Sequence, residues 1–133
     1  MEIKKIHHVA VIVSDYKVSR QFYTEVLGLK IVSENYRKER DSYKLDLEIP
    51  GGSQIELFSF PNPPKRLSYP EARGLRHIAF VVADIEKAVS DLEGRKIEVE
   101  PVRVDPITGK KFTFFKDPDD LPLELYEESE LTN

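Results

Sequence analysis

The chain has 133 residues, a mass of 15.4 kDa and a net charge of -4, which is the size of one ordinary domain. It contains no cysteine, which excludes disulfides, thiolate metal sites and cysteine nucleophiles. The mild acidity argues against binding to nucleic acid or to an anionic membrane. No apolar run is long enough for a membrane span or a signal peptide. We therefore expect a cytoplasmic single-domain protein.

The first half of the chain begins with a strand and a helix. Residues 6–13 are apolar and β-branched apart from two histidines, which is typical of a buried strand. Ser14 or Asp15 can cap a helix that follows. The helical spacing predicts one buried face, made of Val18, Phe22 and Val26.

Three further strands complete this half. Gly28 stands where a left-handed residue ends a helix. Residues 29–34, 43–49 and 54–60 alternate as strands do, and Pro50-Gly51-Gly52 predicts the turn between the last two. Residues 6–60 are therefore interpreted as a first module of strand, helix and three strands.

A proline-rich segment follows. Residues 60–74 contain four prolines and end in glycine, a density that no helix interior tolerates. We interpret residues 61–74 as a linker between two modules, the second of which covers residues 75–128.

The second module has the same order of elements. Residues 76–82 predict a strand, and Asp84 can cap a helix that ends at Gly94. The buried face of that helix has the spacing 3, 4 and 7 and consists of Ile85, Ala88, Val89 and Leu92. Strands are predicted over 97–104, 111–116 and 122–126, with a turn at 117–120.

The two modules are related by a repeat. His77 follows His8 by 69 residues, and Asp84 follows Asp15 by the same interval. Glu124 follows Glu56 by 68 residues, and Gly94 follows Gly28 by 66. Four matches on equivalent elements indicate a duplicated βαβββ unit. The predicted class is α+β.

Four polar residues interrupt apolar strands: His8, Glu56, His77 and Glu124. An unpaired buried carboxylate is costly, so these positions need an explanation. Two imidazoles and two carboxylates form an N₂O₂ ligand set for one divalent metal ion, Ni, Co, Zn, Mn or Fe. His7 competes with His8, because alternation turns only one of two neighbours inward; the repeat favours His8.

The sequence resembles the vicinal oxygen chelate superfamily, which includes glyoxalase I, extradiol dioxygenases, epimerases and bleomycin resistance proteins. The segments FYTEVLGLKIV, IELF, LRHIAFVV and DPDDLPLELYE carry the resemblance. It implies paired βαβββ modules that form a curved mixed sheet around a metal-centred cavity, with the same four ligands. Glutamate at position 56 is typical of glyoxalase I rather than of extradiol dioxygenases.

The resemblance implies a lyase or isomerase that moves a proton next to a metal-bound oxygen. Glu56 or Glu124 is the expected base, and the sequence does not choose between them. In glyoxalase I, an arginine and an amide side chain usually hold glutathione, and this chain has Ile12 and Phe60 at those two positions. At a third glutathione-binding position, Arg73 keeps a basic residue. The alternatives are an extradiol-type dioxygenase and a non-catalytic binding or resistance protein.

Substrate contacts are expected on two surfaces. The basic run over residues 36–44 could form an anion-binding rim, and an aromatic strand could form a pocket wall. The expected substrate-binding residues are Arg37, Arg40, Lys44, Arg73 and Phe112. The expected partners are a small-molecule substrate and a second copy of the chain, with the site inside one chain or between two.

Overall fold

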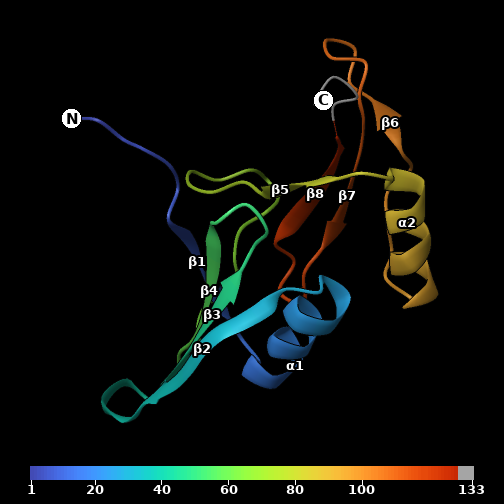
Figure 1. Ribbon diagram of the computed structural model, residues 1–133. Helices are drawn as coiled ribbons and strands as arrows, with labels where there is room; N and C mark the ends of the chain where they lie inside the picture. Colours follow the sequence, from blue (N-terminus) through green and yellow to red (C-terminus); the bar gives the residue numbers. More distant parts are fainter. Residues whose placement is uncertain (129–133) are drawn as a thin grey trace. The chain divides into compact units, whose positions relative to one another are not determined.

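The computed structural model describes residues 1–128 and has the α+β fold that the sequence predicts. The chain divides into two compact units, Met1–Lys65 (unit 1) and Arg66–Asn133 (unit 2). Each unit builds its own four-stranded mixed sheet with one helix (Figure 1), and each is described by itself. Within the described residues, no helix has the length and apolar character that crossing a membrane requires.

Unit 1 contains one parallel and two antiparallel strand pairs. The sheet order is β1-β4-β3-β2; β1 runs parallel to β4, and the other neighbours are antiparallel. The strands are β1 (His8–Val13), β2 (Lys30–Arg37), β3 (Ser42–Glu48) and β4 (Gln54–Ser59). All four strands predicted from the sequence are confirmed, as is the turn at 50–52, where the Gly52 amide donates to the Ile49 carbonyl at 3.1 Å.

The helical segment of unit 1 differs from the prediction in its buried face. α1 (Tyr16–Gln21) is capped by Asp15, whose carboxylate accepts from the Val18 amide at 3.3 Å, and a π-helical turn, η1 (Phe22–Val26), follows. Val18 is 48% exposed, contrary to expectation, whereas Ser19, Phe22 and Tyr23 are buried. The buried residues Ser19, Phe22 and Tyr23 form one stripe with the helical spacing of three and four, and Val18 lies beside this stripe.

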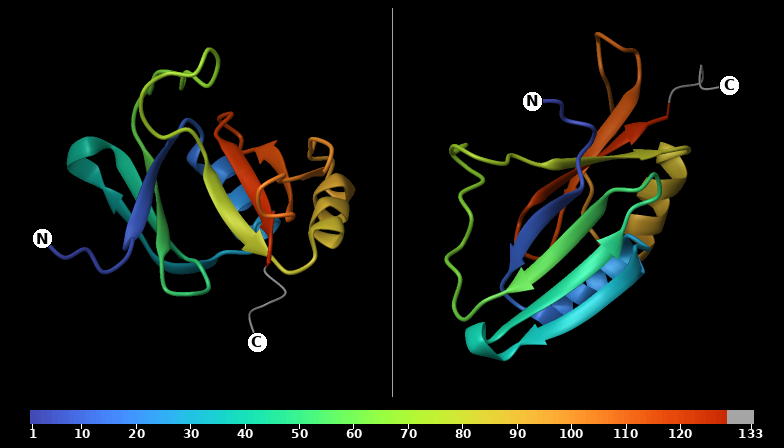
Figure 2. Two further views of the ribbon diagram at one scale, coloured as in Figure 1. Left: turned by 90° about the horizontal axis from the view of Figure 1, so that it is seen from above. Right: turned by 60° about the vertical axis from the view of Figure 1, so that its left-hand side comes forward.

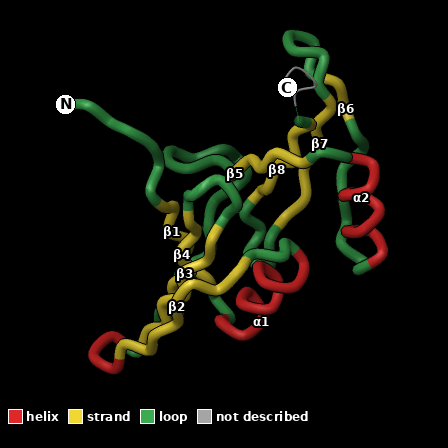
Figure 3. The backbone as a smooth tube through the Cα atoms, in the orientation of Figure 1, coloured by secondary structure: helices red, strands yellow, loops and turns green. Residues whose placement is uncertain are grey.

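The basic run over residues 36–44 forms a tight hairpin. β2 continues to Arg37, the 3₁₀ turn η2 (Lys38–Arg40) reverses the chain, and β3 starts at Ser42 (Figure 3). Asp41 takes the left-handed conformation, with φ of 46°, which aspartate tolerates better than most residues. The basic residues of this run are therefore fixed on strand ends and a turn.

Residues 61–74 contain neither helix nor strand, as their prolines require. The boundary between the two units falls inside this segment.

Unit 2 repeats the topology of unit 1. Its sheet order is β5-β8-β7-β6, with β5 parallel to β8. Its elements are β5 (Ile78–Val82), α2 (Ile85–Gly94), β6 (Arg103–Val104), β7 (Lys111–Lys116) and β8 (Pro122–Glu127). Asp84 caps α2 by accepting from the Lys87 amide at 3.0 Å, and Ile85 and Leu92 are buried, so the predicted cap and face are confirmed.

The predicted strand at 97–104 is wrong for most of its length, because only Arg103–Val104 forms a strand. Pro101 has no amide hydrogen to donate to a ladder. Glu100 instead makes isolated contacts with β7: its amide donates to the Phe114 carbonyl at 2.9 Å, and its carbonyl accepts from the Thr113 hydroxyl at 2.6 Å.

Each sheet has one apolar face and one polar face. In unit 1, α1 lies along the apolar face (Figure 2), where Leu45, Leu47, Ile55 and Leu57 are fully buried. In unit 2, the buried strand residues on the corresponding face are Phe115, Leu123 and Leu125. Alternation along the strands turns the residues between them to the opposite face, and that face carries the candidate ligands.

Candidate metal centre

The parallel strand pairs place one histidine and one glutamate on the same face of each sheet. Ala10 of β1 lies opposite Glu56 of β4, and Ala79 of β5 lies opposite Glu124 of β8. His8 precedes Ala10 by two residues within β1 and therefore faces the same side as Glu56. His77 comes directly before β5, and its contact with Glu124 places it on the same side as that carboxylate. The duplicated sequence thus produces the same arrangement twice.

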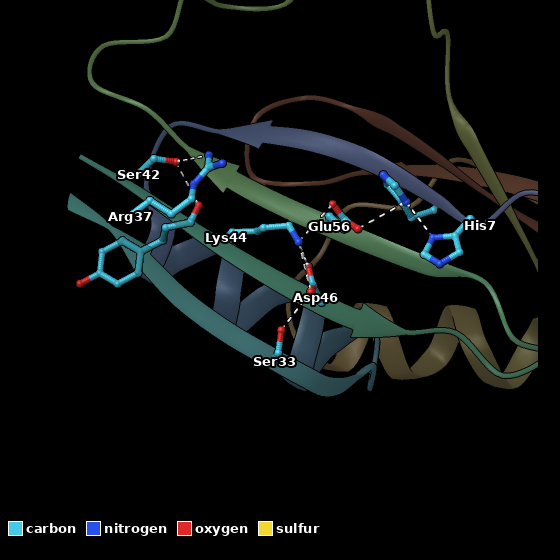
Figure 4. A network of polar contacts seen from close by, with 9 residues as sticks. His7, Ser33, Arg37, Ser42, Lys44, Asp46 and Glu56 are labelled. Atoms are coloured by element: carbon cyan, nitrogen blue, oxygen red, sulfur yellow. Dashed lines mark hydrogen bonds and ion pairs between the residues drawn. The ribbon is translucent and has the colours of Figure 1, made fainter. Parts of the chain in front are cut away.

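In unit 1 the pair consists of His8 and Glu56. The His8 Nδ1 atom lies 3.4 Å from Glu56 Oε2, and the glutamate is 7% exposed. The other carboxylate oxygen, Oε1, lies 3.8 Å from the Lys44 ammonium, which is also 3.3 Å from Asp46 Oδ1 (Figure 4). Glu56 therefore lies between an imidazole and a cation.

His7 adds a third donor to this group. Its Nδ1 lies 2.9 Å from His8 Nδ1, and the donor atoms of His7, His8 and Glu56 all lie within 4.8 Å of one another. Strand alternation predicts that only one histidine faces the site, but β1 begins at His8, so alternation does not govern His7. The adjacent histidines in the sequence were the signal for this candidate ligand.

In unit 2 the pair consists of His77 and Glu124. His77 Nε2 lies 3.2 Å from Glu124 Oε1, and Arg76 Nη1 lies 2.9 Å from His77 Nδ1. Because a guanidinium can only donate, Nδ1 accepts from Arg76, so Nε2 is the nitrogen left to face the carboxylate, and it can bind a metal only after it releases its proton. The His77 and Phe114 rings also pack at right angles, with their centroids 5.1 Å apart.

Within each pair, the two donor atoms are spaced as two ligands of one metal ion would be. Two atoms that each lie about 2.1 Å from a metal, at an angle of about 90–109°, stand roughly 3.0–3.4 Å apart. The observed separations are 3.4 Å and 3.2 Å. Imidazole nitrogen and carboxylate oxygen are suitable ligands for Zn, Ni, Co, Mn or Fe. The two pairs belong to different units, so a single site formed by all four residues stays a prediction.

The predicted substrate-binding residues of unit 1 follow the polar face of its sheet. The Arg37 guanidinium lies 5.0 Å from the centroid of the Phe58 ring and donates to the Ser42 hydroxyl at 3.1 Å. Arg40 lies 4.9 Å from the Phe60 centroid. Lys44 contacts Asp46 and Glu56 as described above, and its role toward a substrate stays a prediction.

The two predicted substrate-binding residues of unit 2, Phe112 and Arg73, lie in different surroundings. Phe112 is half-buried on β7, on the same face as Glu124, and the Arg103 guanidinium lies 4.9 Å from its ring centroid. Arg73 is exposed in the segment before β5, and the structure does not join it to the His77–Glu124 pair.

The clearest electrostatic perturbation in unit 1 lies on the opposite face. Tyr16 donates to Glu34, which also pairs with Arg20 at 2.8 Å. Burial and the neighbouring carboxylate raise the pKa of Tyr16, while the hydrogen bond from Arg20 lowers the pKa of Glu34. Tyr16 stacks on Tyr43 at 4.3 Å. These contacts attach α1 to the sheet.

Comparison with known proteins identifies several similar chains. The family model described as "Glyoxalase/Bleomycin resistance protein/Dioxygenase superfamily" matches residues 5–125. "Uncharacterized protein YwkD" of Bacillus subtilis is 59% identical, with 96% of this chain and all of that protein covered. "Uncharacterized protein YaeR" of Escherichia coli is 57% identical, covering 95% and 98%. The structure of "the glyoxalase family protein from Enterococcus faecalis" is 51% identical, with a TM-score of 0.88 over 96% of this chain and all of the other.

Two more distant relatives have names that state an activity. The "2-epi-5-epi-valiolone epimerase" of an Actinomyces species is 28% identical over 90% of this chain and 77% of its own. The "Lactoylglutathione lyase" of Schizosaccharomyces pombe is 28% identical, and the match covers 98% of this chain but 49% of the yeast protein.

Proposed function

This chain belongs to the Glyoxalase/Bleomycin resistance protein/Dioxygenase superfamily, and from that premise we propose that it is a divalent-metal-dependent lyase or isomerase of the glyoxalase I type. Its substrate is a small carbonyl compound or a thiol adduct of one. The names of the distant relatives, a lyase and an epimerase, support this class of reaction.

The observation that carries the proposal is the repeated histidine–glutamate pair. The two pairs occupy equivalent register positions, with nitrogen–oxygen distances of 3.4 Å and 3.2 Å. The proposed site has two imidazoles and two carboxylates. One glutamate can therefore serve as the base while the two histidines and the other glutamate stay in place as ligands. We propose that the two pairs together form one site, within one chain or between two copies.

The roles of the four residues follow from their contacts. A bound divalent ion would polarise the carbonyl oxygen and acidify the neighbouring C–H group. His8 and His77 would hold it through nitrogen. Glu56 is contacted from both sides, by His8 and by Lys44, which favours a fixed role as a ligand. Glu124 pairs with His77 through Oε1, and we assign to Glu124 the role of accepting the proton from the α-carbon and returning it to the neighbouring carbon.

Metal stoichiometry tests the site. Untagged protein is dialysed against one divalent metal at a time and analysed by elemental mass spectrometry. We expect one tightly held ion per chain, lost in both His8→Ala and His77→Ala. Glu48→Gln, an exposed glutamate on β3, is the matched control and keeps the ion. Two ions per chain, each lost in only one variant, would contradict a shared site, and no ion with any metal would overturn metal dependence.

Proton transfer tests the reaction. Adducts of an α-ketoaldehyde with several thiols are incubated with the metal-loaded protein in deuterated water, and deuterium in the product is measured by NMR. We expect turnover with deuterium incorporation, lost in Glu124→Gln. Oxygen consumption with catechols, unaffected by Glu56→Ala, would instead support a dioxygenase.

A further inference from the structure

The geometry points to an anion-binding subsite at the hairpin end of the unit 1 sheet. Arg37 and Arg40, stacked on Phe58 and Phe60, form this arginine subsite. It takes an oxyanion group, a carboxylate or a phosphate, carried by the small molecule on which the protein acts.

Arg37 is a half-buried cation that pairs with no carboxylate of residues 1–128. Its guanidinium lies between the Phe58 ring, at 5.0 Å, and the Phe60 ring, at 6.0 Å. Its Nη2 atom donates to Ser42, which is fully buried, while its Nε atom is shielded and has no hydrogen-bond partner. Within residues 1–128, no carboxylate lies within ion-pair distance of it. Removing a charge from water without a partner is costly, so an anion from solution is stabilised here.

Arg40 brings a second positive charge to the same aromatic ring. Its guanidinium lies 4.9 Å from the Phe60 centroid, and that of Arg37 lies 6.0 Å from it. The neighbouring Asp41 accepts from the Tyr36 hydroxyl at 2.7 Å. Two like charges near one ring repel each other, and one anion between them relieves that repulsion. Guanidinium groups also match the planar fork of a carboxylate or phosphate.

Unit 2 contains a matched arginine with a different charge balance. Arg103 stacks on Phe112 at 4.9 Å and on Phe114 at 5.7 Å, much as Arg37 stacks on its two rings. However, Arg103 Nη2 pairs with Glu100 at 2.8 Å. Stacking on aromatic rings therefore does not by itself require an external anion, because Arg103 already has a carboxylate partner. Arg37 is stacked in the same way without such a partner, so its charge is available to bind an anionic ligand.

The arginine subsite lies on the same face as the unit 1 histidine–glutamate pair. Phe58 follows Glu56 by two residues on β4, a rise of roughly 7 Å, and Lys44 lies opposite Phe58. Figure 4 shows Arg37, Lys44 and Glu56 in succession along one sheet surface. A molecule whose anionic group is held by Arg37 extends toward Glu56. The identification of this molecule as the substrate rests on the proposed function. The substrate would then be a short-chain carbonyl compound with a carboxylate or phosphate a few bonds from the reacting carbon.

The test measures anion binding to metal-free protein. Protein treated with a chelator and labelled with ¹⁵N is titrated with inorganic phosphate and, separately, with glutarate, and the arginine Nε–H signals are followed by NMR. We expect saturable shifts at Arg37 and Arg40. Arg37→Met weakens binding by about tenfold or more, as the loss of a charge-assisted pair should. The matched control Arg103→Met leaves the affinity unchanged, and the tighter probe identifies carboxylate or phosphate as the group recognised.

Equal affinities in Arg37→Met and Arg103→Met, or no saturable shift with either probe, would overturn the arginine subsite. If Arg37→Met does not fold, Arg40→Met and the charge-conserving Arg37→Lys provide the comparison, and unchanged affinity in both would have the same meaning. The readout needs no metal and no turnover. The absence of saturable anion binding by the unaltered protein thus contradicts the subsite, whereas an empty metal site contradicts the proposed function.

Discussion

Unit 1 places a second imidazole beside its histidine–glutamate pair, whereas unit 2 places a guanidinium there. His7 lies 2.9 Å from His8, and Arg76 lies 2.9 Å from His77. The backbone register is the same in both units, with an alanine opposite each glutamate. The repeat has therefore preserved the frame of the pair and changed its neighbour from a potential ligand to a cation.

The cations of the two sheets also differ in their partners. In unit 2, Arg103 pairs with Glu100 and Lys111 pairs with Glu86. In unit 1, the two arginines of the hairpin stack on aromatic rings and have no carboxylate partner within the described residues. The stacked arginine of unit 2 is thus paired with a carboxylate of its own unit, whereas the stacked arginines of unit 1 are the ones that we propose bind an anion.

The largest expected effect comes from equivalent core residues of the two units. Leu57 is fully buried and Leu125 is 5% exposed, so Leu57→Ala and Leu125→Ala should each lower the free energy of unfolding by about 2–5 kcal/mol. Urea denaturation measures both. Val32→Ala, at a position that is 52% exposed, is the control. A loss below about 1 kcal/mol in only one unit would show that the two cores are not equivalent.

Removing the helix caps should lower the stability of the two units by different and smaller amounts. Asp84 accepts from Lys87 at 3.0 Å and Asp15 accepts from Val18 at 3.3 Å. Asp84→Ala should cost about 1 kcal/mol of unfolding free energy, and Asp15→Ala less, because its hydrogen bond is longer and its helix is shorter. Chemical denaturation of both variants, with Asp84→Asn as a capping-competent control, checks the order. A larger loss at Asp15 would contradict it.

Removing the cation beside His77 should strengthen metal binding. Arg76→Ala takes away a positive charge and releases His77 Nδ1 from its contact, so metal affinity should rise by about threefold. Competition with a chromogenic chelator measures the change, with Arg95→Ala, at the end of α2, as the control. An unchanged or weaker affinity would show that Arg76 does not oppose the ion.

The smallest effect depends on pH. The hydrogen bond from Arg20, followed by that from Tyr16, lowers the pKa of Glu34 in the folded state. Its stabilisation is therefore present above the ordinary glutamate pKa of about 4.3 and is lost as the pH falls through the lower folded-state pKa. Glu34→Gln should unfold more easily at pH 7, by a few tenths of a kcal/mol, and match the wild type in strong acid. A gap that widens in acid would contradict this sign.

The sequence predicted the fold wherever local pattern and tertiary contacts agree. The spacing of Ile85 and Leu92 on α2 is confirmed because a regular helix keeps its period. The spacing through Val18 failed because the buried stripe begins at Ser19, a small polar residue that gives no hydrophobic signal in the sequence. The strand over 97–104 failed because Pro101 cannot join a ladder, although its neighbours have strand-forming side chains.

The candidate site was predictable to a similar extent. Internal repetition identified His8 with Glu56 and His77 with Glu124, and the parallel register brings each pair together. His7 was discounted by a rule that applies only inside a strand. Contacts made by Lys44 and Arg76 depend on which long side chain reaches which neighbour, and sequence spacing does not specify that.

The tyrosine cluster of unit 1 has a spectroscopic consequence. The chain has six tyrosines and no tryptophan. Four of them, Tyr16, Tyr23, Tyr36 and Tyr43, belong to unit 1, where the Tyr36 and Tyr43 rings lie 4.9 Å apart. With no indole to accept their excitation energy, their emission dominates the intrinsic fluorescence, and hydroxyls bonded to Glu34 and Asp41 quench it in the folded state. Unfolding of unit 1 should therefore brighten the protein, which gives that half of the molecule a built-in optical reporter.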